Sequence, residues 1–329
     1  MFLWTPSKAA TMTTLPDVRI KAVHRVVDDG QHNAFTDLVS FRGRFYLTFR
    51  SCPDGHMIFP TSTIRVLVSD DGVTGWQQVF TFAVPERDVR DPHFLIFANQ
   101  LFVYSGTWLC DPEGGTHYDM NDHLGYGAAT TDGVHWDGPR LLEGTYGHYI
   151  WRAAAHGDRA YLCGRRRRGF APGPAESRPE LIQSALLTSD DGWVWCMAGL
   201  FADGHGDETA FLFEADGSLL ALVRGAEPVP ARLSRLHPPY TACTQVDLDG
   251  NVGGPLLARW GNHLLVAGRK SLPGSQPVTA LYWLSEDRLH EIAKLPSGGD
   301  TSYPGFVDRG DGGGLLSYYS SHEGSGGGT

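Results

Sequence analysis

The sequence predicts an all-β protein that folds as a single closed β-propeller of six blades. Three observations support this fold class. A unit of two short apolar runs joined by a tight turn recurs about every 45 to 60 residues, as in repeat architectures of this type. A smaller turn motif recurs in three consecutive copies, and helical periodicity is nearly absent from the chain.

Each recurring unit is expected to be a β-hairpin, because a turn with Gly, Asp or Asn separates its two apolar runs. The six hairpins are expected near residues 34–50, 92–107, 150–165, 209–224, 255–269 and 303–320. Four of them end in an arginine: Arg50, Arg165, Arg224 and Arg269. The first residue and the last residue of a hairpin lie at the same end, so these arginines are expected on one face of the propeller.

The second repeat is a turn between the expected outer strands of three blades. SDDGVTGW (69–76), TTDGVHW (130–136) and TSDDGWVW (188–195) share Ser/Thr-x-Asp-Gly-x-x-Trp or a near variant. The aspartate can accept backbone N–H groups of its own turn, the glycine supplies a positive φ, and the tryptophan can wedge between blades. Because strands alternate in direction, we expect Asp71, Asp132 and Asp191 on the face opposite the arginines.

The last blade has only one recognisable hairpin. The segment DVRIKAVHRVV (17–27) is therefore expected to supply a strand that closes the ring, since full closure removes exposed sheet edges. The expected organisation is an N-terminal extension over residues 1–16, the propeller over 17–324 and a flexible Gly-rich tail over 325–329.

Composition narrows the classes of partner. The net charge of −10 argues against nucleic acid, and no apolar run approaches the length of roughly 18 residues that crosses a membrane. The first residues lack a basic segment followed by a long apolar one, so a cytoplasmic location is expected. Five scattered cysteines without a CxxC pair predict neither a disulfide framework nor a zinc cage. We expect no cofactor, no required metal, and a monomer or weak homo-oligomer.

The three Asp turns on a blade repeat, with arginines, a glutamate and a tyrosine in a set order, resemble the sialidase-like superfamily of Asp-box (BNR-repeat) β-propellers. The tail GGDTSYPGFV…LLSYYSSHEG is also similar to bacterial sialidase-like glycosidases. The resemblance covers about residues 30 to 324, and it is specific for the fold more than for the activity, since lectins, lyases and other glycosidases share such turns.

The resemblance implies a set of site residues. Sialidases bind a sugar carboxylate with three arginines and attack the anomeric carbon with a tyrosine that a glutamate activates. This chain offers Arg50, Glu208, Arg224, Arg269 and Tyr303 in the implied order. The alternative for each arginine is an ion pair with an acid of a neighbouring blade, for which Asp37, Asp91, Glu208 and Asp300 are candidates.

Two departures from the family pattern affect the expected substrate. The first arginine stands in FRSC instead of Phe-Arg-Ile-Pro, and the general-acid aspartate that should follow has no clear counterpart. Asp54 and His56 lie in the corresponding loop, and Asp91 begins the second hairpin, so all three are candidates for the acid.

Further polar residues stand at the same ends of the hairpins and are expected on the rim of a sugar site. They are His32, Asp37, Arg90, Arg152, Arg165, Asp300 and His322. The run Arg165–Arg168 is expected to be a solvated loop edge, in which Arg165 is the residue that points inward.

Three functions remain open from the sequence. The first is a hydrolase that removes a terminal, acidic sugar by means of Tyr303, Glu208 and the arginines. The second is a lyase or another glycosidase on uronate-containing glycans, in which His32 or His56 does the acid–base work. The third is a non-catalytic carbohydrate-binding propeller. All three have a carbohydrate partner, anionic in the first two.

Overall fold

In the computed structural model the regular secondary structure of the described residues is almost entirely β-strand. The structure describes residues 15–111, 119–173, 177–225, 229–271 and 274–322. Its helices are three single turns of 3₁₀ type, η1 (Met120–Asp122), η2 (Arg168–Phe170) and η3 (Pro179–Leu181). In the described residues no helix is long and apolar enough to cross a membrane. The expected extension over 1–16 and the tail over 325–329 lie almost wholly outside the described residues.

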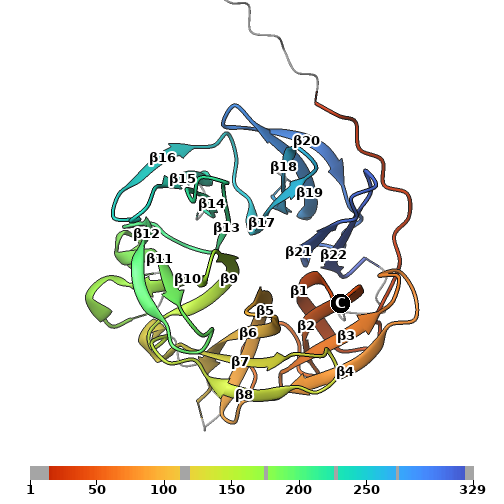
Figure 1. The fold of residues 1–329 in the computed structure, drawn as a ribbon, viewed down its shortest axis with the longest axis horizontal. Coiled ribbons are helices and arrows are strands. Elements are labelled where there is room, and N and C mark those ends of the chain that lie inside the picture. The colour runs from red at the N-terminus through yellow and green to blue at the C-terminus, as the bar shows by residue number, and fades with distance from the viewer. Residues whose placement is uncertain (1–14, 112–118, 174–176, 226–228, 272–273, 323–329) are drawn as a thin grey trace, which may run out of the picture.

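Five four-stranded antiparallel sheets and one two-stranded sheet surround a central axis (Figure 1). The first three blades are β1 (His32–Phe41), β2 (Arg44–Cys52), β3 (Thr63–Ser69), β4 (Gln77–Phe82); β5 (Arg87–Phe97), β6 (Gln100–Leu109), β7 (Leu124–Thr130), β8 (Asp137–Leu141); and β9 (Tyr149–His156), β10 (Arg159–Arg167), β11 (Ile182–Ser189), β12 (Cys196–Ala202). The others are β13 (Thr209–Phe213), β14 (Leu219–Val223), β15 (Arg232–Leu236), β16 (Cys243–Asp247); β17 (Gly253–Trp260), β18 (His263–Lys270), β19 (Val278–Ser285), β20 (Arg288–Lys294); and β21 (Thr301–Asp308), β22 (Gly314–Ser320).

The all-β propeller is confirmed, but the prediction of six blades is wrong, because the described residues form five complete ones. The sixth sheet consists of β21 and β22 alone. The segment 17–27 does not close it, since it forms no strand. It runs extended along the outside of the ring (Figure 1), where the indole N–H of Trp283 donates to the carbonyl of Pro16 over 2.8 Å. A strand-like sequence thus lies along the ring without joining a sheet, and most of its residues are exposed.

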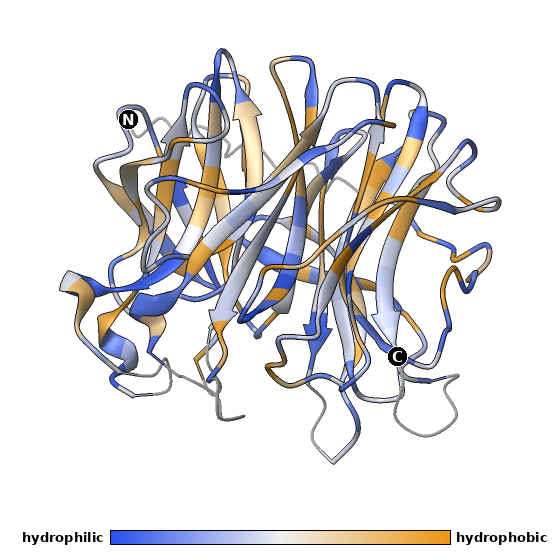
Figure 2. Ribbon diagram, turned by 90° about the horizontal axis from the view of Figure 1, so that it is seen from below, coloured by the Kyte–Doolittle hydropathy of each residue, from blue (hydrophilic) through white to orange (hydrophobic). Residues whose placement is uncertain are grey.

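The first strand of every sheet lies nearest the axis (Figure 1), and the strands run across the thickness of the disc (Figure 2). Three of these inner strands carry a shift in register close to one face, at 34/37, 90/93 and 302/305, and β17 carries one at 253/256. At these bulges the backbone is left-handed, with φ of 60° at Phe35, 51° at Asp91, 55° at Gly254 and 53° at Tyr303. A bulge redirects a side chain out of the alternating pattern of a strand. Here it turns Asp91 and Tyr303 toward the same part of the ring.

A buried arginine ties four sheets together near the axis. Arg152 of β9 donates to the carbonyl of Pro255 in β17 over 3.2 Å and to that of Pro304 in β21. Its Nη1 also lies 3.1 Å from the Oδ1 of Asp37 in β1. Asp37 in turn accepts the backbone N–H of Phe94 in β5 over 2.8 Å. This set of bonds fixes the inner strands relative to one another.

The three Asp turns have the predicted internal bonding. The Oδ1 of Asp191 accepts the N–H groups of Trp193 and Val194 over 2.7 and 2.9 Å, and Asp71 and Asp132 accept the corresponding pairs. Their strand register places them beside the starts of β2, β6 and β10, at the opposite end from Arg50 and Arg165. The predicted location of these turns on the other face is confirmed for these blades.

The tryptophans of two of these turns pack across blade boundaries. Trp136 stacks on Phe80 of the first blade with ring centroids 5.2 Å apart. Trp195 is buried and meets Tyr104 of the second blade edge-on at 5.7 Å.

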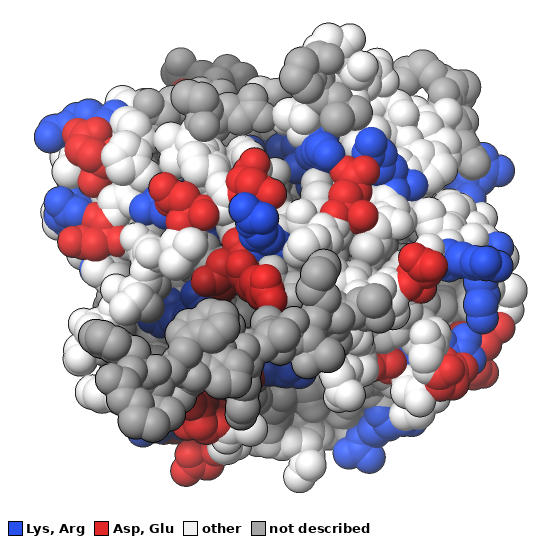
Figure 3. Space-filling view, turned by 90° about the horizontal axis from the view of Figure 1, so that it is seen from above, with Lys and Arg blue, Asp and Glu red and all other residues white. Residues whose placement is uncertain are grey.

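On the side of the disc in Figure 3, acidic and basic side chains alternate instead of gathering in one basic patch.

Candidate active site

A tyrosine and a glutamate from different sheets meet in the ring. Tyr303 follows the start of β21, Glu208 immediately precedes β13, and the Tyr303 hydroxyl donates to Glu208 Oε1 over 2.7 Å. Both residues are buried, with 6% and 8% of their surface exposed. The resemblance to sialidases implied these two residues, and the structure brings them together although 95 positions separate them.

Glu208 is held as a carboxylate by its neighbours. Its Oε2 accepts Nη1 of Arg224 over 2.8 Å and the backbone N–H of Gly254 over 2.9 Å. Burial alone would raise the pKa of Glu208, but Arg224, the Tyr303 hydrogen bond and Arg165 outweigh it and lower that pKa below its ordinary value. Glu208 is therefore ionised and ready to accept a proton.

Tyr303 is held as a neutral phenol. Burial, together with the negative charge of Glu208, raises the pKa of Tyr303 well above its ordinary value, and Arg224 and Arg269 oppose this rise. The ring packs against Phe35 and Trp151, with centroids 4.7 and 5.2 Å away. The ring packing and the hydrogen bond from its hydroxyl to Glu208 together fix the orientation of the side chain.

Arg269 is the arginine of this group that has no carboxylate partner. It ends the same inner hairpin that contains Gly254, opposite Gly253 in the β17–β18 ladder. In the described part of the chain it forms no ion pair and no side-chain hydrogen bond, although it is only partly exposed. A half-buried guanidinium without a partner is a ready site for an anion.

A second carboxylate, that of Asp207, lies close to the guanidinium groups of Arg165 and Arg224. Asp207 Oδ1 lies 2.6 Å from Nη1 of Arg165, and Asp207 Oδ2 lies 3.9 Å from Nε of Arg224. The Nε atoms of both arginines are buried without a hydrogen bond. Of the run Arg165–Arg168, Arg165 does face inward. Arg167 is also buried, contrary to expectation, because its Nε donates to the carbonyl of Ala171.

Asp91 forms the opposite wall with Tyr149 and Arg90. It accepts the hydroxyl of Tyr149, and its other oxygen is buried without a hydrogen bond. Burial and the nearby charge of Glu208 raise the pKa of Asp91 to about 7, while Arg90 opposes the rise. Nη2 of Arg90 donates to the carbonyl of His56 over 2.6 Å, and its guanidinium lies over the Phe35 ring.

Arg50 does not join the predicted arginine triad. It is fully buried, and its Nε and Nη2 donate to the two oxygens of Asp88 over 2.9 and 3.2 Å. Its other bonds go to the carbonyls of Gly55 and Met57 and to Nδ1 of His32. All five N–H donors are used, so Arg50 orders the loop after β2 instead of facing a ligand. Its FRSC context differs from the family motif in the same region.

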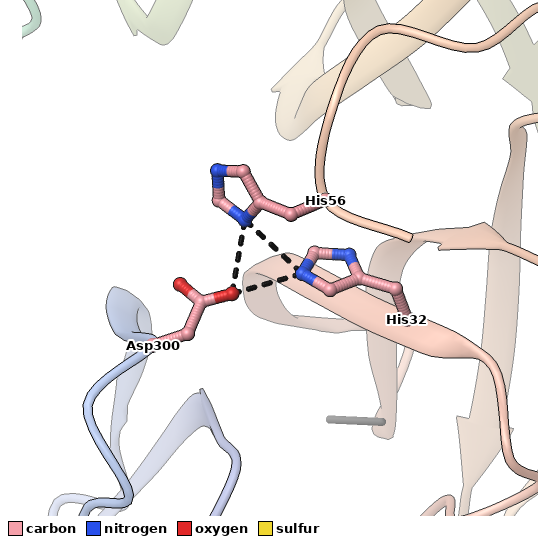
Figure 4. A group of neighbouring side chains, drawn as sticks. All are labelled: His32, His56 and Asp300. Carbon is pink, nitrogen blue, oxygen red and sulfur yellow. Dashed lines mark hydrogen bonds and ion pairs between the residues drawn. The ribbon is translucent and has the colours of Figure 1, made fainter. Parts of the chain in front are cut away.

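Two histidines and an aspartate converge beside the tyrosine (Figure 4). Oδ2 of Asp300 lies 2.9 Å from Nε2 of His32 and 2.9 Å from Nδ1 of His56, and the two nitrogens are 3.1 Å apart. The hydroxyl of Tyr319 donates to the other oxygen of Asp300 over 2.9 Å. His56 and Phe35 meet edge-on at 5.6 Å, so this group borders Tyr303 through one shared ring.

This trio is also the place where the described residues could hold a metal ion, since its three ligand atoms lie within 4.8 Å of one another. The donor set of two imidazoles and a carboxylate suits a transition metal. However, Arg50 donates to Nδ1 of His32, which leaves the proton on the Nε2 that a metal would need. The neighbours of His32 therefore favour a hydrogen-bonded group over a metal centre.

The remaining predicted residues lie away from the Tyr303–Glu208 pair or are committed to the fold. Asp37 and Arg152 bond to each other beneath the site and are structural, contrary to the prediction that they bind substrate. Asp54 accepts the Thr61 hydroxyl over 2.5 Å within its own exposed loop. His322 is exposed beyond β22, where its Nδ1 lies 2.7 Å from the hydroxyl of Ser320.

Sequence reasoning missed several residues of the site: Phe35, Asp88, Tyr149, Asp207, Gly254 and Tyr319. Asp207 directly precedes Glu208, so its place was within reach of the sequence. The others depend on which blades become neighbours or on bulges that no simple pattern marks.

Comparisons with solved structures agree with this architecture. Trypanosoma rangeli sialidase, in complex with the inhibitor DANA, superposes with a TM-score of 0.65 at 13% identity, covering 87% of this chain and 52% of the sialidase. A GH43 β-1,3-galactosidase superposes with a TM-score of 0.52 at 11% identity, covering 80% of this chain and 93% of that one. An exo-β-1,3-galactanase from Phanerochaete chrysosporium gives 0.53 at 11% identity, covering 87% and 67%.

These likenesses establish the sialidase-like propeller fold and nothing finer. The chain spans about half the length of the sialidase that it matches. No protein-family model and no curated protein match the sequence. Activity must therefore be argued from the site.

Proposed function

We propose that this protein is a glycoside hydrolase that removes a terminal acidic sugar through a covalent intermediate on Tyr303. The observation that carries the proposal is the buried hydrogen bond from Tyr303 to an ionised Glu208, beside Arg269, which has no carboxylate partner among the described residues. A phenol is a poor nucleophile unless a base accepts its proton as it attacks. Glu208 is in place to be that base.

The arginines select the substrate. Arg269 is open to an anion, and Arg224 lies between Glu208 and Asp207 with its Nε unbonded. A carboxylate held by these two side chains would lie next to the Tyr303 hydroxyl. The preferred substrates are therefore sugars whose carboxylate is attached at, or next to, the anomeric carbon. A neutral nucleophile also avoids the repulsion that a carboxylate would feel from such a sugar.

The reaction balances in two displacements. The Tyr303 oxygen forms a bond to the anomeric carbon, its proton passes to Glu208, and the bond to the leaving oxygen breaks with its electron pair on that oxygen. A phenol becomes strongly acidic as its oxygen bonds to carbon, so even a weakly basic Glu208 suffices. Water then attacks the same carbon, the bond to Tyr303 breaks, and the tyrosine oxygen recovers its proton from Glu208. The proton that the water loses balances the one that the leaving oxygen takes up.

The structural neighbours support the choice of reaction without deciding it. Trypanosoma rangeli sialidase has been solved with 2,3-difluorosialic acid as a covalent intermediate, and a TM-score of 0.65 relates that structure to this chain. Enzymes of one propeller fold differ widely in chemistry. The proposal therefore rests on Tyr303, Glu208 and Arg269.

The test is covalent trapping followed by turnover. Wild-type protein treated with 2,3-difluorosialic acid is expected to gain the mass of the fluorosugar on the peptide that contains Tyr303. Tyr303→Phe is expected to remain unlabelled. Glu208→Gln should lower kcat by about 10²-fold or more, because it removes the base. Arg269→Lys should mainly raise KM for acidic glycosides, since a point charge cannot reproduce the fork of a guanidinium.

One alternative reading has an observation of its own. The His56–Asp300 contact would also suit a lyase, in which Arg269 binds a uronate carboxylate and a histidine removes the proton next to it. A product with a new double bond and near-ultraviolet absorbance, formed equally well by Tyr303→Phe, would establish that chemistry. Glycan binding without turnover, unchanged in Glu208→Gln, would instead indicate a binding protein.

A further inference from the structure

The leaving group of the proposed reaction needs a proton donor, and the sequence offers three candidates. Asp54 is exposed in its own loop and bonded to Thr61. Asp91 is buried, with 5% of its surface exposed, on the wall that it forms with Tyr149 and Arg90. His56 lies at the mouth, with 44% of its side chain exposed. A leaving group that points from Tyr303 toward solvent passes the mouth, not the wall.

The hydrogen bonds around His32 fix which of its nitrogens carries a proton. The guanidinium of Arg50 is always a donor, and its Nη1 lies 3.4 Å from Nδ1 of His32. Nδ1 of His32 therefore accepts, and Nε2 carries the proton and donates to Oδ2 of Asp300 over 2.9 Å. Arg50 is itself fixed by both oxygens of Asp88.

The same reasoning extends to His56. Its Nδ1 lies 2.9 Å from Oδ2 of Asp300, and a lone pair there would face the lone pairs of the carboxylate. Nδ1 of His56 also lies 3.1 Å from Nε2 of His32, but the charged carboxylate is the stronger acceptor, so we assign a proton to this Nδ1 and a hydrogen bond from it to Asp300. The other ring nitrogen, Nε2, is left as the atom that gains and loses a proton, and it points away from the carboxylate (Figure 4).

Asp300 is built to keep a negative charge behind this imidazole. Burial would raise its pKa, but the hydrogen bonds from His32 and His56, the charge of His56 and the hydroxyl of Tyr319 hold the pKa of Asp300 far below its ordinary value. An aspartate that accepts from Nδ1 both orients an imidazole and stabilises its protonated form. Arg90 holds the loop on the other side, since its Nη2 donates to the carbonyl of His56.

We propose that Nε2 of His56 is the general acid and base of this site, oriented by Asp300, with Arg50 and His32 as positioning residues. This rests on the proposed function and adds its missing proton donor. In the first step, protonated His56 gives its Nε2 proton to the leaving oxygen as the glycosidic bond breaks. In the second step, neutral His56 takes a proton from water as the water oxygen bonds to the anomeric carbon and the bond to Tyr303 breaks.

The experiment separates the two steps with a leaving group that needs no proton. Fluoride departs as an anion, so His56→Gln is expected to be labelled by 2,3-difluorosialic acid within about threefold of the wild-type rate. Hydrolysis of the labelled enzyme, and turnover of a sialoside with a sugar alcohol as leaving group, are expected to fall by about 10²-fold or more. Asp300→Asn should show the same split to a smaller degree.

Two further variants keep the result specific. His290→Gln, at an exposed position of β20, is the matched histidine control and should behave as wild type. Asp91→Asn tests the rival acid. The inference is overturned if His56→Gln hydrolyses its label at the wild-type rate, or if Asp91→Asn shows the split instead. Thermal melting of each variant identifies any that are misfolded. If His56→Gln is misfolded, the same measurements on Asp300→Asn test the inference in its place.

The remaining outcomes are also decisive. If purified protein carries a stoichiometric transition metal, and dialysis against EDTA abolishes turnover until zinc or manganese is restored, His32 and His56 are metal ligands and the acid–base assignment is wrong. If wild-type protein is never labelled at Tyr303, the proposed function itself fails and this inference falls with it. If the wild type is labelled at Tyr303 and His56→Gln hydrolyses its label as fast as the wild type, this inference is rejected and the proposed function stands.

Discussion

Tyr303 and Asp91 occupy the same kind of position in two different blades. Each stands in a left-handed conformation at a bulge of an innermost strand, with φ of 53° and 51°. Such a conformation costs a non-glycine residue about 1 kcal/mol, so the surrounding structure must hold it. Here Glu208 holds the Tyr303 hydroxyl, and Tyr149 donates to Asp91. The two side chains thereby reach the centre of the ring, where a regular strand would direct them to either face of its sheet.

The raised pKa of Asp91 predicts a specific dependence of stability on pH. The carboxyl is protonated in the folded protein up to pH about 7, whereas the unfolded chain ionises near 3.8. Between these values the unfolded state binds fewer protons, so this residue makes the fold less stable as pH rises from about 4 to 7, and its contribution is constant above that. Asp91→Asn should therefore gain stability relative to wild type across this window, by up to about 4 kcal/mol.

Urea denaturation of both proteins at several pH values between 4 and 8 measures this difference. A stability difference that stays flat over the window, or one that falls as pH rises, would show that Asp91 is ionised in the folded state. It would then act as a fixed charge opposite Arg90 and not as a neutral carboxylic acid.

At the scale of the element, the inner hairpin of the fifth blade serves the site through its backbone. Gly254 donates its N–H to Glu208, and its φ is 55°. A Cβ at this position would come within 2.8 Å of the Tyr303 ring. Glycine is required here for two reasons at once, the left-handed conformation and the close approach of the nucleophile.

Gly254→Ala is expected to displace Tyr303 and lower kcat by at least about tenfold, because small displacements at a reacting centre are costly. Gly261→Ala is the matched control: its φ is 57°, and no atom lies within 4 Å of its Cβ position. Both variants should lose about 1 kcal/mol of stability from backbone strain. Steady-state kinetics measure this difference. A kcat that is lowered equally in both variants would mean that backbone strain alone, and not the contact with Tyr303, is responsible.

At the scale of the whole molecule, Arg152 holds the inner strands of four sheets together. It joins β9 to β17, β21 and β1, and its partner Asp37 reaches β5. The incomplete sixth sheet is thereby anchored at the axis, through the carbonyl of Pro304, although it lacks outer strands. The position of Tyr303, one residue before Pro304, depends on the same bond.

Arg152→Met is expected to destabilise the fold by about 3 to 5 kcal/mol, because it leaves the buried Asp37 without its countercharge. Arg259→Met provides the matched control, since its ion pair with Glu214 is exposed and should contribute less than about 1 kcal/mol. Urea unfolding followed by tryptophan fluorescence measures both. Equal losses in the free energy of unfolding of the two variants would contradict the role of Arg152 in holding the inner strands together.

The repeating hairpins and the Asp turns could be predicted from local patterns, because turn residues and alternating apolar residues stand close together in the sequence. The pairing of Tyr303 with Glu208 was implied only by the resemblance to sialidases, since no local pattern connects residues 95 positions apart. Prediction from the sequence failed where neighbouring blades decide. Arg50 and Arg152 look like the other arginines at hairpin ends. Only the fold shows that Asp88 and Asp37 neutralise them, while Arg269 has no carboxylate partner in the part of the chain that the structure describes. The segment 17–27 alternates like a strand, but pairing needs an edge in the right place. Only the tertiary structure brings His56 to Asp300 across 244 residues, since long-range contacts depend on how the ring closes and not on any local propensity.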